Sequence, residues 1–240
     1  MMSVESAEEY LECIYDLTKN GDPAKTNDIA SRMDIGPGSV TEMIQKLADR
    51  GHLDYQKYKG VTLTEKGLVL ARKVKRKHRI LESFLVNFLG MNRGDSHEEA
   101  CRLEHTISDE SEKRLCLMMD NPKLCPDGEP IPKCEEDCAL CEREPSVSLT
   151  RMRKGEHGLI THLRCDKSPE KIRKLISMGL VPGRRVKVEE EAPIGGALVV
   201  GLGESKVALG KEYASLVHVG NITNRNESPH RQGRRVKTRL

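Results

Sequence analysis

The sequence predicts a mainly α-helical protein with a small β component: a winged helix-turn-helix, a second helical domain and a C-terminal β barrel. Three observations predict this fold. Apolar residues recur at helical spacing through the first half, a polar and apolar alternation follows the third helix, and short apolar strands fill the second half. A chain of 240 residues is long enough for two compact domains or one large one.

The composition indicates a soluble protein with a well-charged surface. Hydrophobic residues make up 37% and charged residues 32%, and the net charge is only +3, so any nucleic-acid binding must come from local patches. No apolar run approaches the roughly 18 residues of a membrane helix, and the acidic N-terminus shows no signal peptide, which predicts a cytoplasmic location. Eight cysteines in such a compartment indicate metal or redox use more than disulfides.

The first 70 residues predict a helix-turn-helix with a wing. A first helix is expected over residues 7–18, a short second helix begins at Thr26 or Asn27, and a third runs from about Ser39 to Asp49. The alternating segment HLDYQKYKGVTLTEKG, around Lys59-Gly60, predicts a hairpin. The second helix of such a motif fits the DNA major groove, although the same pattern also fits a three-helix core without a ligand.

Polar positions on the third helix are the candidate DNA contacts. We expect Ser39, Thr41 and Glu42 at base edges, with Glu42 suited to a cytosine amino group but repelled by phosphate. Gln45 and Lys46 are candidates for phosphate.

A basic helix is expected over residues 63–89, where the run KVKRKHRI could touch phosphates or form a solvated face. Residues 90–94 end it. The next helix is predicted to begin near Asp95 or Ser96, both good caps, and to continue through SDESEKRLCLMM.

The stretch HEEACRLEH predicts a metal site. On a helix, His97, Cys101, Glu104 and His105 share one face, which offers two imidazoles, a thiolate and a carboxylate. This mixture suits a transition metal better than a hard ion such as magnesium. His78 and Glu82 form a second pair of the same spacing on the preceding helix. The alternative is a charged, solvent-facing side of an amphipathic helix.

A second constellation lies in CPDGEPIPKCEEDCALC, which contains Cys125, Cys134, Cys138 and Cys141. The final CxxC lets two thiolates chelate one ion, and two further thiolates complete four. Four thiolates serve structural zinc or a 4Fe-4S cluster, and free thiols are the remaining alternative.

The second half predicts a small β barrel. Its strands are HGLITHL, RRVKVEEE, GALVVGL and SKVALG, with the helix PEKIRKLISMGL after the first. The polar residues after it should be disordered. The expected boundaries are 1–72 for the winged-helix DNA-binding domain, 73–121 for the helical dimerisation and metal-binding domain, 122–146 for a Cys-rich linker, 147–222 for the barrel domain and 223–240 for a disordered basic tail.

The segments YLECIYDL, RKHRILE and HEEACRLEHTISDESEKRL, in this order around a winged helix, resemble the DtxR family of metal-dependent transcriptional regulators over about residues 5–145. The resemblance implies a DNA-binding domain, a dimerisation domain and two metal sites. It implies His78, Glu82 and His97 as ligands of one site. It implies Glu9, Cys101, Glu104 and His105 as ligands of the other.

The resemblance also bears on the metal. Iron-type members usually carry Met at the position of Glu9 and Cys at that of Cys101, whereas manganese-type members usually carry carboxylates at both, so this chain is mixed. The thiolate favours iron(II). The C-terminal part resembles a FeoA-type, SH3-like domain, which in iron-type relatives can donate further ligands; Asp166 and Glu170 are the nearest candidates here.

We therefore expect a homodimeric, iron(II)-activated repressor of metal-homeostasis genes that binds an operator in double-stranded DNA. A manganese(II)-responsive regulator and an iron-sulfur or redox sensor using the cysteine cluster are the alternatives. A metalloenzyme is disfavoured because we find no Gly-rich phosphate loop or nucleophile elbow, and an iron-transport accessory module would leave the winged helix unexplained. The basic tail serves DNA affinity or solubility through Arg231, Arg234, Arg235, Lys237 and Arg239.

Overall fold

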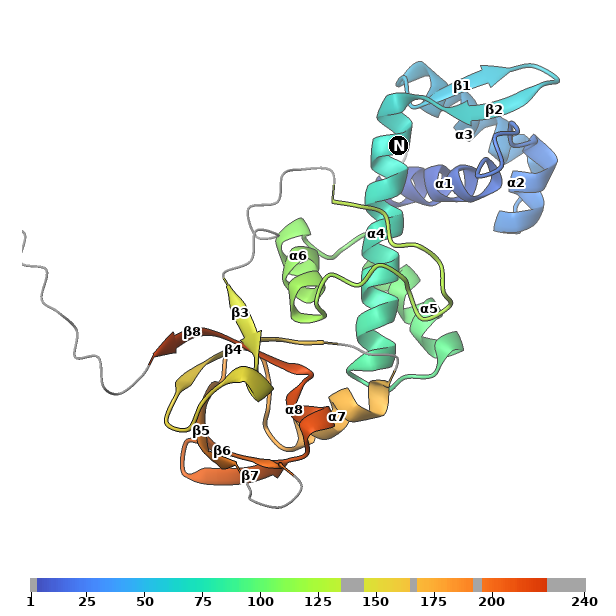
Figure 1. Cartoon of the computed structure of the whole chain (residues 1–240). Helices are drawn as coiled ribbons and strands as arrows, with labels where there is room; N and C mark the ends of the chain where they lie inside the picture. Colours follow the sequence, from blue (N-terminus) through green and yellow to red (C-terminus); the bar gives the residue numbers. More distant parts are fainter. Residues whose placement is uncertain (1–3, 135–144, 165–167, 192–195, 224–240) are drawn as a thin grey trace, which may run out of the picture. The chain divides into compact units, whose positions relative to one another are not determined.

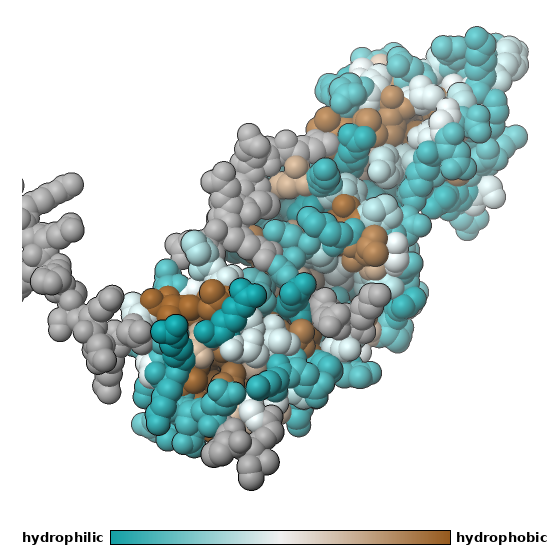
Figure 2. Space-filling view, viewed as in Figure 1, coloured by the Kyte–Doolittle hydropathy of each residue, from teal (hydrophilic) through white to brown (hydrophobic). Residues whose placement is uncertain are grey.

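The computed structural model describes residues 4–134, 145–164, 168–191 and 196–223 (Figure 1). It divides into two compact units. The first comprises residues 1–117 and 121–142, and the second comprises residues 118–120 and 143–240. Within the described ranges, no helix combines the length and the apolar character needed to cross a membrane. Hydrophilic side chains cover most of the face seen in Figure 2, with smaller hydrophobic patches between them.

The first unit is helical apart from one hairpin. Its elements in chain order are α1 Val4–Leu17, α2 Thr26–Met33, α3 Pro37–Asp49, β1 Leu53–Gln56, β2 Gly60–Leu63, α4 Glu65–Asn87, α5 Arg93–Leu103 and α6 Asp109–Met118. β1 and β2 pair antiparallel, with Gln56 opposite Gly60. The predicted helix-turn-helix and its wing are therefore confirmed.

The winged helix packs around a core that the helical spacing predicts. Leu11 and Ile14 of α1, Ile29 of α2, and Ile44 and Leu47 of α3 are almost fully buried. Burial of such a side chain contributes roughly 1.5–3 kcal/mol. This core fixes α3 relative to α1, so α1 cannot move without displacing α3, the expected DNA-recognition helix.

α4 is the long helix that connects the winged helix to the rest of the unit. Thr64 caps its N-terminus by accepting from the Gly67 amide. Its first turns pack on α1, and its last turns form a second core with α5, in which Leu81, Leu85 and Ala100 are buried. The expected boundary between residues 72 and 73 falls inside this helix, and the segments on both sides belong to one compact unit.

Two local predictions in this region were wrong. The N-cap of α5 is Asn92, whose side chain accepts from the Asp95 amide, rather than Asp95 or Ser96. The single helix predicted from there to SDESEKRLCLMM is two helices, because residues 104–108 turn and Ser108 then accepts from the Ser111 amide. Side-chain capping of backbone groups competes with a continuous helix at such positions.

The segment after α6, predicted as a linker, packs on α4 over its described part. The carbonyl of Pro132 accepts from Arg76 at 2.7 Å, Arg79 donates to the carbonyl of Pro130, and Ile131 is buried. Leu124 and Pro130 form an isolated bridge. No helix or strand occurs between residues 119 and 134.

The second unit is a six-stranded antiparallel sheet with strand order β3-β8-β4-β5-β6-β7. Its elements are β3 Ser146–Ser148, a 3-10 turn Leu149–Arg151, β4 His157–Leu163, α7 Pro169–Ser177, β5 Arg185–Glu191, β6 Leu198–Leu202, β7 Ser205–Leu209, α8 Lys211–Ala214 and β8 Val217–Thr223. The four predicted strands and the helix are confirmed, whereas β3 and β8 had not been singled out as strands. The mainly helical fold with a small SH3-like sheet domain is therefore confirmed.

Candidate metal centre

The candidate ligands meet where α1, α4 and the end of α5 lie together in the first unit. Helical spacing places His78 and Glu82 one turn apart on α4, and His97 and Cys101 one turn apart on α5. Glu104 and His105 follow in the turn after α5. Because α4 and α5 share an apolar core, the side chains on α4, on α5 and in the turn after α5 are held against one another.

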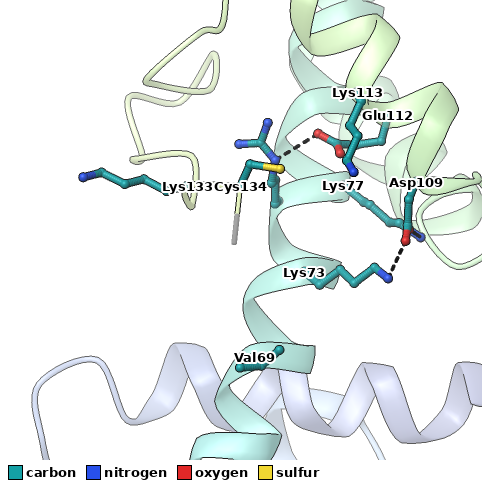
Figure 3. Close-up of a pocket in the computed structure, with 9 residues that line it drawn as sticks. Val69, Lys73, Lys77, Asp109, Glu112, Lys113, Lys133 and Cys134 are labelled. Atoms are coloured by element: carbon teal, nitrogen blue, oxygen red, sulfur yellow. Dashed lines mark ion pairs between the residues drawn. The ribbon is translucent and has the colours of Figure 1, made fainter. Parts of the chain in front are cut away.

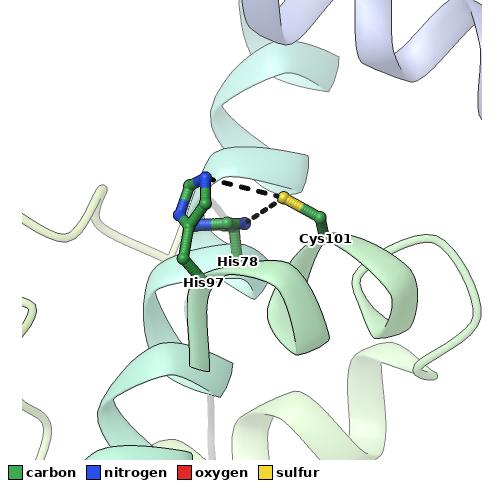
Figure 4. Close-up of side chains that lie close together, drawn as sticks. All are labelled: His78, His97 and Cys101. Carbon is green, nitrogen blue, oxygen red and sulfur yellow. Dashed lines mark hydrogen bonds between the residues drawn. The ribbon is translucent and has the colours of Figure 1, made fainter. Parts of the chain in front are cut away.

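His78 lies at the middle of the cluster. Its Nδ1 is 2.6 Å from Glu104 Oε2, and its Nε2 is 3.1 Å from both Glu82 Oε1 and His97 Nδ1. Cys101 Sγ lies 3.8 Å from His78 Nδ1 and 3.9 Å from His97 Nε2 (Figure 4). The two ligand sets that the family resemblance implies as separate therefore meet at His78 in this structure.

α1 reaches the cluster through Glu8. Glu8 Oε2 is 2.7 Å from His105 Nδ1, and His105 Nε2 is 3.2 Å from Glu104 Oε1. The implied ligand Glu9 is exposed and lines the same pocket as Cys101 and His105. Its role as a ligand stays a prediction.

The structure adds Glu12, which the sequence analysis did not single out. Donor atoms of Glu12, His78 and Glu104 lie within 4.8 Å of one another, as do those of His78, His97 and Cys101. The available signal was the spacing of Glu8 and Glu12, which places two carboxylates one turn apart on the first helix. Only the packing of α1 on α4 shows that this face points at His78.

Burial and mutual contacts set the protonation of the cluster. Burial would lower the pKa of His78, but hydrogen bonds to Cys101, Glu104 and Glu82 raise its pKa to about 12. Burial would raise the pKa of Glu82, but the contacts with His78 and His97 lower its pKa to about 2. For Glu104, burial raises the pKa, and the neighbouring Glu12 carboxylate adds to this effect.

This donor set fits a divalent transition-metal ion. Burying several carboxylates together costs free energy unless a cation lies among them, because they repel one another. Here the cation is the protonated imidazole of His78. Imidazole, thiolate and carboxylate donors together suit iron, manganese or zinc. A metal ion would compete with the proton on His78, because imidazole binds metal in its neutral form.

The basic run from Lys73 to Arg79 is only partly a solvated face, because two of its cations are buried. Lys75 and Arg79 are both buried. Lys75 forms ion pairs with Glu12 and Asp16, and Arg79 forms one with Glu129. The more exposed residues pair as well: Lys73 and Lys77 both contact Asp109, in a pocket that Cys134 also lines (Figure 3).

The cysteine cluster is described only in part. Cys125 is buried and Cys134 is half-buried, and the predicted Cys138 and Cys141 lie outside the described residues. The two candidate ligands from the C-terminal domain belong to the second unit. Glu170 lies in the first turn of α7, and Asp166 lies outside the described residues. These ligand assignments stay predictions.

α3 presents the candidate DNA contacts on its outer face. Ser39, Glu42, Gln45 and Lys46 are exposed, and Thr41 is half-buried with its hydroxyl donating to the Pro37 carbonyl at 2.9 Å. Lys46 Nζ pairs with Glu42 Oε1 at 2.6 Å, which partly neutralises the acidic side chain. At the tip of the wing, Tyr58 is 89% exposed.

Comparison with known proteins matches three families along the chain. Residues 2–61 match the N-terminal DNA-binding domain of iron-dependent repressors, and residues 64–133 match their metal-binding and dimerisation domain. Residues 147–220 match the FeoA domain.

Individual relatives agree with these matches. The iron-dependent repressor IdeR of Mycobacterium tuberculosis is 35% identical over 231 residues, which cover 91% of this chain and 98% of IdeR. The HTH-type transcriptional regulator MntR of Lysinibacillus sphaericus is 36% identical over 127 residues, covering 51% of this chain and 91% of MntR. A manganese-dependent transcriptional repressor solved in complex with manganese superposes with a TM-score of 0.51 at 30% identity, over 89% of this chain and 99% of that chain.

The matched domains follow the order of the helical elements and the sheet in this structure. The relatives are transcriptional repressors, which confirms the prediction that the chain is a regulator rather than an enzyme. The chain belongs to the DtxR family of metal-dependent DNA-binding repressors.

Proposed function

We propose that the chain is a cytoplasmic homodimeric repressor of metal-homeostasis genes that binds operator DNA when iron(II) is available. The observation that carries this proposal is the convergence of α1, α4 and the end of α5 on His78. α1 belongs to the core that fixes the recognition helix, so a group held between α1 and α5 also fixes the DNA-binding surface.

The proposed ligands are those of the candidate centre. His78, Glu82 and His97 would hold one ion, and Glu9, Cys101, Glu104 and His105 would hold a second. A bound ion supplies the positive charge that the buried carboxylates need. Glu8, which contacts His105, would lie beside the second ion.

Metal control of DNA affinity follows from dimer geometry. A dimer presents two recognition helices, which must match successive major grooves about 34 Å apart. Fixing α1 against α5 favours one spacing of the two helices. A hundredfold change in operator affinity needs about 2.7 kcal/mol of difference in metal binding between two arrangements, which one or two ligands can supply.

Iron(II) is favoured over manganese(II) by the Cys101 thiolate, which is a softer donor than manganese prefers. The relatives include an iron-dependent repressor and a manganese-dependent one, so family membership leaves the ion open. For the cysteine cluster we propose structural zinc, with a 4Fe-4S cluster as the alternative.

DNA binding under anaerobic conditions tests the proposal. A fluorescently labelled fragment from upstream of the protein's own gene is titrated with protein in chelator, and then with iron(II), manganese(II) or zinc(II). Tight binding that needs iron(II) and is lost in Cys101→Ala would support the proposal. Binding of equal strength in chelator would overturn it. A response to manganese(II) alone would overturn only the choice of ion.

A further inference from the structure

Lys75 is a buried cation beside the candidate metal centre. It lies on α4 one turn before His78, and it is only 9% exposed. Its Nζ is 2.8 Å from Glu12 Oε1 and 2.9 Å from Asp16 Oδ2. Both carboxylates belong to α1 and are spaced one turn apart, so the ammonium lies between two acidic side chains of the neighbouring helix.

Glu12 is shared between this ion pair and the centre. Its donor atoms lie within 4.8 Å of those of His78 and Glu104, while Lys75 lines the same pocket as Cys101 and His105. One carboxylate oxygen of Glu12 contacts Lys75. The carboxylate that could add a hard oxygen donor to the centre is therefore already neutralised by a tethered cation.

Asp16 holds Lys75 in this position. The Asp16 side chain is only 9% exposed. Its carboxylate contacts Lys75 and, at 3.1 Å, Arg32. Moving the ammonium away from Glu12 would separate charges that are largely removed from water, and such a pair is costly to break from one side. Asp16 therefore anchors Lys75 without help from any of the proposed metal ligands.

We propose that Lys75 is a specificity-determining residue of the metal centre, because it withholds the Glu12 carboxylate from a bound ion. This inference rests on the metal binding proposed above. With Glu12 withheld, the thiolate of Cys101 and the imidazoles make up more of the donor set, which favours iron(II) over manganese(II). Removing the ammonium would release an oxygen donor that manganese(II) prefers.

Metal titrations without DNA test this role. The affinities for iron(II), measured anaerobically, and for manganese(II) are compared in wild type, Lys75→Met, Glu12→Gln and the double variant. Lys73→Met is the matched control, since Lys73 lies on the same helix and pairs with the exposed Asp109. We expect Lys75→Met to raise the affinity for manganese(II) relative to iron(II) by about tenfold, a change of the size that substitutions beside metal ligands produce in metal affinity. The gain should vanish when Glu12 is Gln.

A purely structural clamp would behave differently. It would lower the denaturation midpoint of Lys75→Met without changing the ratio of the two metal affinities. If that variant does not fold, Lys75→Gln removes the charge but keeps a hydrogen-bond donor, and it should shift the ratio in the same direction. In the metal-free protein, Lys75→Met should lower the urea midpoint less when Glu12 is Gln, because the partner carboxylate is then uncharged.

The outcomes separate this inference from the function on which it rests. A wild type that binds neither metal would overturn both. A wild type that binds metal, with Lys75→Met no different from Lys73→Met in the affinity ratio, would overturn the role of Lys75 alone.

Discussion

Metal binding at the site that contains His78 should release about one proton per ion near neutral pH. The contacts of His78 raise its pKa to about 12, so the metal-free centre holds a protonated imidazole. A ligand imidazole must be neutral. If His78 binds the ion, it gives up that proton. Since the competing proton is removed as pH rises, the metal affinity must rise with pH.

The size of the effect follows from this stoichiometry. Each displaced proton changes the affinity about tenfold per pH unit, which corresponds to about 1.4 kcal/mol. One proton therefore predicts a gain of about tenfold from pH 6.5 to pH 7.5. Glu82 contributes little over this range, because it stays ionised with a pKa lowered to about 2.

Calorimetric titration measures the protons directly. Binding heats recorded at one pH, in buffers that differ in ionisation enthalpy, give the number of protons released, and affinities at several pH values give the slope. His78→Gln should release about one proton fewer, whereas Lys73→Met should release the same number as wild type. An affinity that does not change with pH, or a His78→Gln variant with the wild-type proton count, would refute the assignment of His78 as a ligand.

Three further predictions follow from single contacts. Contacts with His78 and His97 lower the pKa of Glu82 from 4.5 to about 2, so the stability that these contacts supply is present above about pH 4.5 and is lost as pH falls towards 2. Urea unfolding of the metal-free protein should show a loss of up to about 3 kcal/mol over this range, and the Glu82→Gln variant should not show it. Gly67→Ala should destabilise the winged helix by about 1–3 kcal/mol in a thermal melt, since a Cβ at this position would lie 2.0 Å from the His52 carbonyl oxygen. Gly38→Ala is the control, because a Cβ there would have nothing within 4 Å, and it should be neutral or stabilising. Lys46→Ala should weaken DNA binding about equally for all sequences and reduce the salt slope by about one, and a loss confined to one sequence would instead indicate base contact.

Periodicity predicted most of the fold and much of the site. The apolar spacing of Leu11 and Ile14 specified the face of α1 that is buried, and the spacing of His97 and Cys101 placed both on one face of α5. These are local relations along a helix, which the sequence displays directly. The turn after α5 was not predicted, because HTIS carries neither Gly nor Pro and its capping by Ser108 competes with an otherwise continuous helical pattern.

The residues that were missed depend on contacts between distant segments. Glu12 and Lys75 are separated by 63 positions and pair only because α1 packs on α4. From sequence, Lys75 is one cation in a basic run, and such a run is usually exposed. The paired carboxylates on α1 explain why it is buried here. A pattern search on one helix cannot find a partner that comes from another.

The central claim is that metal binding and operator binding are coupled through α1. Reciprocity requires that operator DNA tighten metal binding by the same factor by which metal tightens operator binding. The decisive measurement is the affinity for iron(II), determined anaerobically with and without a saturating operator fragment. We predict a gain of about a hundredfold with DNA, matching the gain in DNA affinity with metal. Equal iron(II) affinities with and without DNA would contradict the coupling.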